Sequence, residues 1–165
     1  FFFRYGSVGA VYLIMNDSDI LLVDNLCTAL FGPDAEARKR ADQQLSPLCR
    51  VEGINQLRCV MEKSNNSMAH YFVSATLLRL ITDSWNTFTV EQRIDLRQWL
   101  FNVIGNKAPT MERHNVNTLI LVLCRLTKLG WLDHQVHQEL PANVNNFFLS
   151  SSTPAHVVTG LNILN

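Results

Sequence analysis

Apolar residues recur along most of the chain at the three- and four-residue spacing of an amphipathic helix. The full pattern i, i+3, i+4, i+7, i+8 occurs four times, and shorter matches appear near residues 54–61 and 157–164. No segment alternates between apolar and polar residues over the length of a strand. The pattern therefore predicts an all-α fold, with buried stripes at Val23, Leu26, Cys27, Leu30, Phe31; Val73, Thr76, Leu77, Leu80, Ile81; Leu96, Trp99, Leu100, Val103, Ile104; and Val116, Leu119, Ile120, Leu123, Cys124.

Helix boundaries follow from the prolines and capping residues. Gly32 and Pro33 predict the end of one helix and the first turn of the next, where proline is tolerated. Thr89 and Gln92 have the spacing of a capping box, and Thr153 precedes Pro154 in a similar start. The predicted helices cover residues 18–31, 33–48, 52–63, 68–84, 90–105, 111–129, 134–149 and 154–165.

Two helices recur roughly every 35–45 residues, a period within the range of HEAT repeats. We therefore predict an α-solenoid over residues 17–165: about four antiparallel helix pairs stacked in a right-handed superhelix. The last predicted helix carries Val157, Leu161 and Leu164 as its apolar stripe, without a polar outer face. Because a finished solenoid needs a polar capping repeat, we expect a truncated array.

The first residues differ from the rest of the chain. Residues 1–14 hold one charge and an apolar run too short to span a bilayer. We expect residues 1–16 to be a non-native or poorly ordered extension, and residues 1–14 to be dispensable for folding.

Charge and cysteine content argue against a nucleic-acid-binding protein, a protein of anionic membrane surfaces and a disulfide-bonded protein. Basic and acidic residues number 14 each, so a broad nucleic-acid-binding surface or a surface for anionic membranes is not expected. Cys27, Cys49, Cys59 and Cys124 form no CxxC pair, and we interpret them as reduced residues of an intracellular protein rather than disulfides.

Candidate chemistry is sparse. The chain has no glycine-rich phosphate loop. His134 and His137 follow Asp133, but two further ligands at metal spacing are missing, so a solvated loop and helix start is favoured over a metal site. Cys124, next to Arg125, is interpreted as a core cysteine rather than a nucleophile. We expect no enzyme activity and no cofactor.

Several segments resemble a known family. Residues 40–45 (RADQQL) and 73–81 (VSATLLRLI), followed by Trp85, are similar to the N-terminal domain of the importin-β (karyopherin) superfamily. Residues 91–97 (EQRIDLR) and 125–133 (RLTKLGWLD) are more distinctive, and resemble the exportin seven group of Ran-binding proteins. The similarity extends over residues 20–165, whereas residues 1–14 match nothing and the stretch 108–117 is more polar.

The resemblance implies a nuclear transport receptor that binds Ran-GTP, protein cargo and nucleoporins while shuttling between cytoplasm and nucleus. In that family the second helix of each pair faces Ran, which implies a role here for residues 33–48, 68–84 and 111–129. Arg79 matches a family lysine. The alternative is a generic α-solenoid scaffold without Ran binding. Trp85, Trp99 and Trp131 are predicted to pack between repeats. The implied Ran-facing candidates are Arg38, Arg79, Asp83, Arg125 and Lys128.

Overall fold

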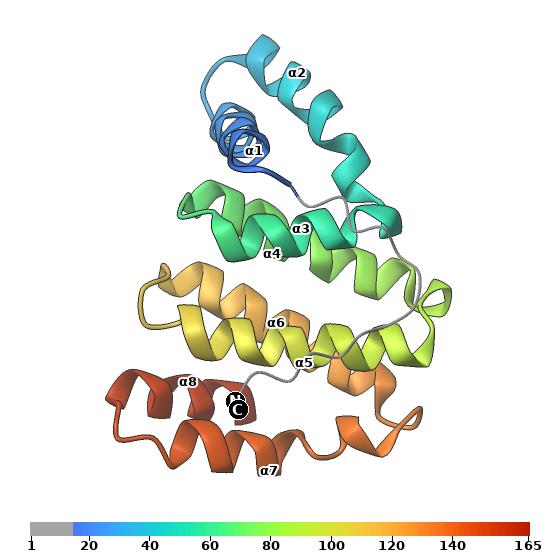
Figure 1. Cartoon of the computed structure of the whole chain (residues 1–165), viewed down its shortest axis with the longest axis vertical. Coiled ribbons are helices and arrows are strands. Elements are labelled where there is room, and N and C mark those ends of the chain that lie inside the picture. The colour runs from blue at the N-terminus through green and yellow to red at the C-terminus, as the bar shows by residue number, and fades with distance from the viewer. Residues whose placement is uncertain (1–14) are drawn as a thin grey trace.

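The computed structural model of the chain describes residues 15–165, which form a stack of helices without a strand (Figure 1). This arrangement confirms the all-α prediction; the right-handed superhelix stays a prediction. Short 3-10 helices cover Ser46–Cys49, Val51–Gly53, Trp85–Thr87 and Gln135–His137. The α-helices are α1 (Asp17–Leu30), α2 (Ala35–Leu45), α3 (Ile54–Lys63), α4 (Ser67–Asp83), α5 (Val90–Lys107), α6 (Arg113–Gly130), α7 (Leu140–Val144) and α8 (Pro154–Leu164).

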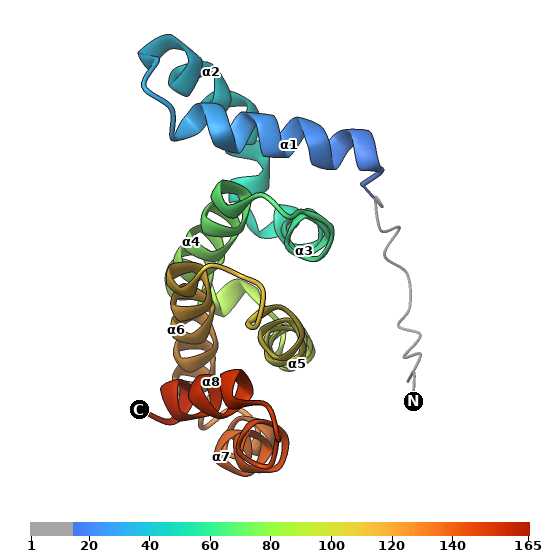
Figure 2. The same ribbon diagram turned by 90° about the vertical axis from the view of Figure 1, so that its left-hand side faces the viewer.

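The helices form successive antiparallel pairs, with α4, α6 and α8 in one layer and α3, α5 and α7 in the other (Figure 2). The first pair is turned relative to the rest, since α1 is seen from the side where α3, α5 and α7 are seen end-on. The α4–α6 interface is the most extensive between helices. Asn115 fixes its alignment, because its Nδ2 donates to the carbonyl oxygen of Ser67 at 3.0 Å and to its Oγ at 3.1 Å.

Met15 and Asn16, the residues before α1, make hydrogen bonds to α3 and α1. Asn16 caps α1 in a capping box: its side chain accepts from the Asp19 amide at 2.9 Å, and the Asp19 carboxylate accepts from the Asn16 amide at 2.9 Å. The carbonyl oxygen of Met15 accepts a 2.8 Å hydrogen bond from Lys63. The boundary predicted after residue 16 stays a prediction, and the prediction for residues 1–14 lies outside the described residues.

Proline accounts for the main errors in helix boundaries. The helix predicted over residues 33–48 begins at Ala35, capped by Asp34, and ends at Leu45, before a 3-10 helix that contains Pro47. The helix predicted over residues 134–149 begins only at Leu140, and Asn145–Leu149 continues it as a π-helical turn. Pro141 occupies its first turn, because inside a longer helix its ring would clash with the preceding turn.

The capping box of α5 is confirmed. Thr89 Oγ1 accepts from the Gln92 amide at 3.3 Å, and Gln92 Oε1 accepts from the Thr89 amide at 2.9 Å. Pro154 stands in the first turn of α8 as predicted, although Thr153 makes no side-chain capping bond.

The predicted stripes of α4, α5 and α6 lie in one continuous core, with Cys124 only half-buried. The stripe of α1 is buried at Val23 and Cys27, whereas Phe31 is exposed.

The stripe predicted for α8 is wrong. Leu161 and Leu164 are 54% and 46% exposed, while the buried face carries Thr159, Gly160 and Ile163. A Cβ atom at Gly160 would lie 2.6 Å from Cβ of Phe148, so the side of α8 that lacks a side chain is the one that approaches its neighbour.

The three tryptophans have different surroundings. Trp99 is buried in the core, and its Nε1 donates a 2.6 Å hydrogen bond to Glu62 of the neighbouring repeat. The ring of Trp85 lies under the guanidinium of Arg93, 4.2 Å from Cζ to the ring centroid. Trp131 is 44% exposed, so its assignment as a packing residue was wrong.

Candidate functional site

One face of the α4–α6 layer combines exposed side chains from two parallel helices. On α6, residues 114, 121, 125 and 128 recur at helical spacing and form one stripe; all four are exposed. On α4, residues 68, 71, 79, 82 and 83 are exposed, on the side opposite the core stripe. We call this surface the α4/α6 face. It carries Met68, Tyr71, Arg79, Thr82 and Asp83 from α4, and His114, Leu121, Arg125 and Lys128 from α6.

Taken together, the second helices carry more basic than acidic residues, mainly because of α6, although the chain as a whole is neutral. Helix α6 contains three basic residues and no acidic one, and α8 contains neither lysine, arginine, aspartate nor glutamate. Together, helices α2, α4, α6 and α8 contain seven basic residues and three acidic ones. The basic residues are Arg38, Lys39, Arg40, Arg79, Arg113, Arg125 and Lys128; the acidic ones are Glu36, Asp42 and Asp83.

Two of the predicted residues share an open cleft. Arg79 and Asp83 line a cavity of about 310 Å³ together with Cys49, Arg50, Val51 and Glu52. Nη2 of Arg79 donates a 3.2 Å hydrogen bond to the carbonyl oxygen of Cys49, so this arginine also holds the turn before α3 against α4. Part of its hydrogen-bonding capacity is therefore used within the chain.

Arg125 and Lys128 lie one turn apart on α6 and are exposed. Within residues 15–165 neither forms an ion pair or a side-chain hydrogen bond. Arg38 is set apart from them on α2, where its Nη1 donates to the carbonyl oxygens of Gly32 and Pro33 at 2.9 and 2.8 Å. The fold thus brings four of the five predicted residues onto neighbouring helices and leaves Arg38 on another.

A row of exposed rings crosses the same layer, and the sequence did not indicate it. The ring centroids of Phe31 and Tyr71 lie 5.3 Å apart at 69°, and those of Tyr71 and His114 lie 6.2 Å apart at 55°. Phe31 and Tyr71 are 43% and 40% exposed. The sequence feature that could have revealed these rings is Tyr71, an aromatic residue that lies off the apolar stripe of its helix. We call these three residues the ring row.

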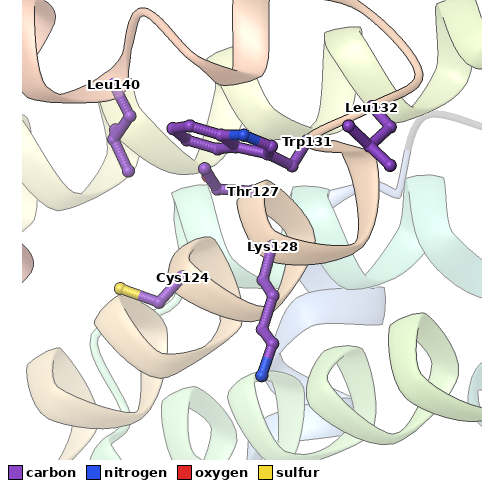
Figure 3. Close-up of a pocket in the computed structure, with 6 residues that line it drawn as sticks. All are labelled: Cys124, Thr127, Lys128, Trp131, Leu132 and Leu140. Atoms are coloured by element: carbon purple, nitrogen blue, oxygen red, sulfur yellow. The ribbon is translucent and has the colours of Figure 1, made fainter.

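A second cavity, of about 530 Å³, opens at the end of α6 (Figure 3). The Trp131 ring and Leu140 lie on one side of it, and Lys128 extends away from that ring. The lining is largely apolar, and burial raises the pKa of the Cys124 thiol, so a reactive thiolate is disfavoured there. This arrangement suits apolar contact rather than nucleophilic chemistry. Its lining residues are Cys124, Thr127, Lys128, Trp131, Leu132 and Leu140.

The prediction that His134 and His137 lie in a solvated loop and helix start is correct for His134 and wrong for His137. His134 is exposed, and its Nδ1 accepts from the Val136 amide at 3.2 Å, but His137 is fully buried against Gly130. Burial, and then the charge of Arg97, lower the pKa of His137. In residues 15–165 no three His, Cys, Asp or Glu side chains gather as metal ligands would. His137 is buried, in spite of its polar neighbours in the sequence, because its ring occupies the space that a side chain at position 130 would fill.

Over the described part of the chain, no helix has the length and apolar character needed to cross a membrane.

Comparison with known proteins gives three informative relatives. Ran-binding protein 17 of Mus musculus is 32% identical over 145 residues, which cover 84% of this chain and 13% of that protein. Exportin-7-A of Xenopus laevis is 27% identical over 145 residues, with the same coverage. Ran-binding protein 16 of Drosophila melanogaster is 26% identical over 152 residues, covering 88% of the chain and 13% of the relative.

The chain thus spans 13% of the length of these relatives. No family model and no solved structure matches it. The similarity to these relatives nevertheless extends over most of the chain and confirms the resemblance found in residues 91–97 and 125–133. This chain is a relative of the exportin-7 and Ran-binding protein 16/17 group.

Proposed function

We propose that this chain is part of a nuclear transport receptor that binds Ran in its GTP form and helps to carry protein cargo through the nuclear pore. The observation that carries the proposal is the similarity over 84% of the chain to proteins named for Ran binding and for export. Nucleoporin contacts and shuttling between nucleus and cytoplasm belong to the same proposal.

The basic character of the second helices supports the choice of surface. The excess of basic residues comes mainly from α6, since Arg79 and Asp83 balance each other on α4; a partner with an acidic surface would be attracted to α6, and such attraction raises the association rate. The α4/α6 face is therefore the proposed contact surface for Ran. Within it, Arg125 and Lys128 are the strongest candidates, because no group in the described residues engages them. Arg79 would contribute with the donors that its bond to Cys49 leaves free.

Dependence on GTP has a physical basis in the partner. The γ-phosphate orders the switch segments of a GTPase, so the GTP and GDP forms present different surfaces to a receptor. If Ran and cargo bind to the same solenoid, each changes the affinity for the other by the same factor. A rigid stack of helix pairs with one continuous core is suited to transmit that coupling.

The test is a titration of the full-length protein with Ran loaded with a non-hydrolysable GTP analogue or with GDP, followed by fluorescence anisotropy. We expect binding of the GTP form to be at least about tenfold tighter, which corresponds to about 1.4 kcal/mol. Equal binding of both forms would discard GTP-dependent recognition of Ran, and absence of binding to either form would leave the generic scaffold as the function.

Charge variants then test the surface. Lys128→Gln and Arg125→Gln each remove one positive charge from the α4/α6 face and should weaken binding of the GTP form. The matched control is Gln98→Glu, which lowers the net charge by the same amount at an exposed position of α5, in the other layer. If the control weakens binding as much as the two α6 variants, net charge rather than this face determines the affinity.

A further inference from the structure

We infer that the ring row of Phe31, Tyr71 and His114 is the apolar anchor of the Ran interface, with the basic residues of α4 and α6 beside it. The inference rests on the proposed function and adds to it residues that the sequence did not single out. The partner we assign to this surface is the GTPase: an apolar side chain of Ran would lie on the ring of Tyr71, between Phe31 and His114.

The ring row joins three successive helix pairs. Phe31 is the C-cap residue that follows α1, Tyr71 lies in the second turn of α4, and His114 lies in the first turn of α6. Centroid separations of 5.3 and 6.2 Å, with tilted or edge-on planes, fall in the range of favourable aromatic contacts. The three rings therefore form one continuous surface rather than three separate exposed residues.

Hydrogen bonds on both sides hold the ring row in place. Nδ2 of Asn66, the residue that caps α4, donates to Thr28 Oγ1 at 3.0 Å and to the Asp24 carbonyl oxygen at 3.3 Å, so α4 is tied to α1. Asn115 ties α6 to α4 through Ser67. Because the backbone positions are fixed before a partner arrives, binding requires little ordering of this surface.

Exposure of these rings is consistent with an interface. Phe31 and Tyr71 leave about two-fifths of their surfaces in water, and the Tyr71 hydroxyl has no hydrogen-bond partner among residues 15–165. Tyrosine combines a large apolar surface with one polar group, which is why it is enriched at the centres of protein interfaces. Tyr71, the middle ring, is the expected centre of the contact.

The charges around the ring row include the carboxylate of Glu112, whose Oε2 lies 3.3 Å from Nδ1 of His114, and two arginines farther along the helices. Arg79 follows Tyr71 by eight residues on α4, and Arg125 follows His114 by eleven on α6. At 1.5 Å per residue these arginines lie about 12 and 16 Å along the helices from the ring row. The matching surface of the partner therefore has an apolar side chain with carboxylates at about that distance on one side. The continuity of the ring row with the proposed Ran surface favours the GTPase over cargo or a second copy of this chain.

The experiment compares Tyr71→Ala with Tyr71→Phe in the full-length protein, titrated with Ran loaded with the GTP analogue. We expect Tyr71→Ala to weaken binding about thirtyfold, as for a residue at the centre of an interface, and Tyr71→Phe to weaken it less than about fivefold. The control is Phe147→Ala, because Phe147 is 47% exposed but lies beyond the α4/α6 face, in the turn after α7. This control should bind Ran like the unmodified protein.

Hydroxyl-radical footprinting of the unmodified protein provides a second test that does not depend on variants. Phe31 and Tyr71 should become protected when the GTP form binds, while Phe147 should stay reactive. If the unmodified protein discriminates GTP from GDP but Tyr71 stays reactive, or if Tyr71→Ala binds normally, the ring row is not the anchor and the proposed function stands. If protection follows binding of cargo or self-association instead of binding of Ran, the GTPase is not the partner of the ring row. If neither nucleotide form binds, the proposed function itself fails.

Discussion

Trp99 and Glu62 connect two adjacent repeats through a 2.6 Å hydrogen bond from the indole Nε1 to the carboxylate. Trp99 belongs to α5 and Glu62 to α3, so the bond joins helices of the same layer. Arg58 reinforces it: its Cζ lies 5.1 Å from the Trp99 ring centroid, and its Nη1 pairs with Asp95 at 2.6 Å. One large aromatic residue thus combines burial, a hydrogen bond and a cation–π contact at a single junction.

Trp99→Phe should lower the free energy of unfolding by about 1–2 kcal/mol, because it removes the hydrogen bond to Glu62 and reduces the cation–π contact with Arg58. Urea denaturation followed by circular dichroism measures this loss. Glu62→Gln is the control, since it keeps an acceptor oxygen, and it should cost less than Trp99→Phe. The opposite order would show that the carboxylate charge, rather than the indole bond, stabilises the junction.

A second pair holds the loop after α6. Arg93 pairs with Asp133 through Nη1 and also donates from Nη2 to the Trp85 carbonyl oxygen at 2.9 Å. The side chains of this pair are 12% and 29% exposed. Asp133→Ala should destabilise the fold by about 1.5–3 kcal/mol and increase hydrogen exchange at residues 134–138, since a charged hydrogen bond shielded from water is lost.

The Arg58–Asp95 pair offers a comparison for that variant. Asp95 has a side chain that is 65% exposed, so Asp95→Ala should cost less than about 1 kcal/mol. Equal losses for the two alanine variants would mean that burial does not determine the strength of these pairs.

The sequence predicted the fold well where one helix face is continuously apolar. The stripes of α4, α5 and α6 lie in the core, and Thr76, a weak member of its stripe, is buried with the rest. Thr89 and Gln92 marked the start of α5 because a capping box depends only on local geometry. Such features depend on neighbours within one turn, which a sequence displays directly.

Features that depend on contacts between helices were not predictable. Leu161 and Leu164 have the spacing of a buried stripe, yet Gly160 faces the core because only a residue without a side chain allows α8 to approach Phe148. His137 is buried for a similar reason, since its ring occupies the space beside Gly130. Of the candidate site, the basic residues were identified through the resemblance. The ring row was not, because Phe31, Tyr71 and His114 meet only in three dimensions.

Gly160→Ala tests the close approach of α8. The added methyl group would lie 2.6 Å from Phe148 Cβ and 3.0 Å from Leu149 Cδ2, which forces a shift in the packing. The loss of stability should be about 1–3 kcal/mol, in spite of the better helix propensity of alanine. Asn162→Ala, at an exposed position of the same helix, is the control and should be neutral or slightly stabilising. A stabilising Gly160→Ala would show that α8 does not pack closely on this turn.

The last prediction concerns pH and His137. Burial, and then the positive charge of Arg97, lower its pKa from the ordinary value of 6.5, while Asp133 opposes the shift and His134 and Arg93 add to it. As the pH falls through about 6.5, the unfolded chain therefore binds a proton at this histidine before the folded chain does. The contribution of this histidine to the free energy of unfolding is present above that pH and is lost below it, by up to about 1.4 kcal/mol per pH unit for one such group. His70 acts in the same direction, because burial lowers its pKa as well.

Urea midpoints measured between about pH 7.5 and pH 5.5 should therefore decrease with decreasing pH. In His137→Leu the decrease should be smaller, because one of the two buried histidines no longer takes part, and His70 accounts for what remains. The slope is the diagnostic quantity, since a loss of packing lowers stability equally at every pH, whereas a lost titration changes only its pH dependence. Leu126→Ala is the control: it removes packing from the core but no titrating group, so it should leave the slope unchanged. An unchanged slope in His137→Leu would mean that the buried imidazole does not resist protonation, and that the acid sensitivity arises at His70 or elsewhere.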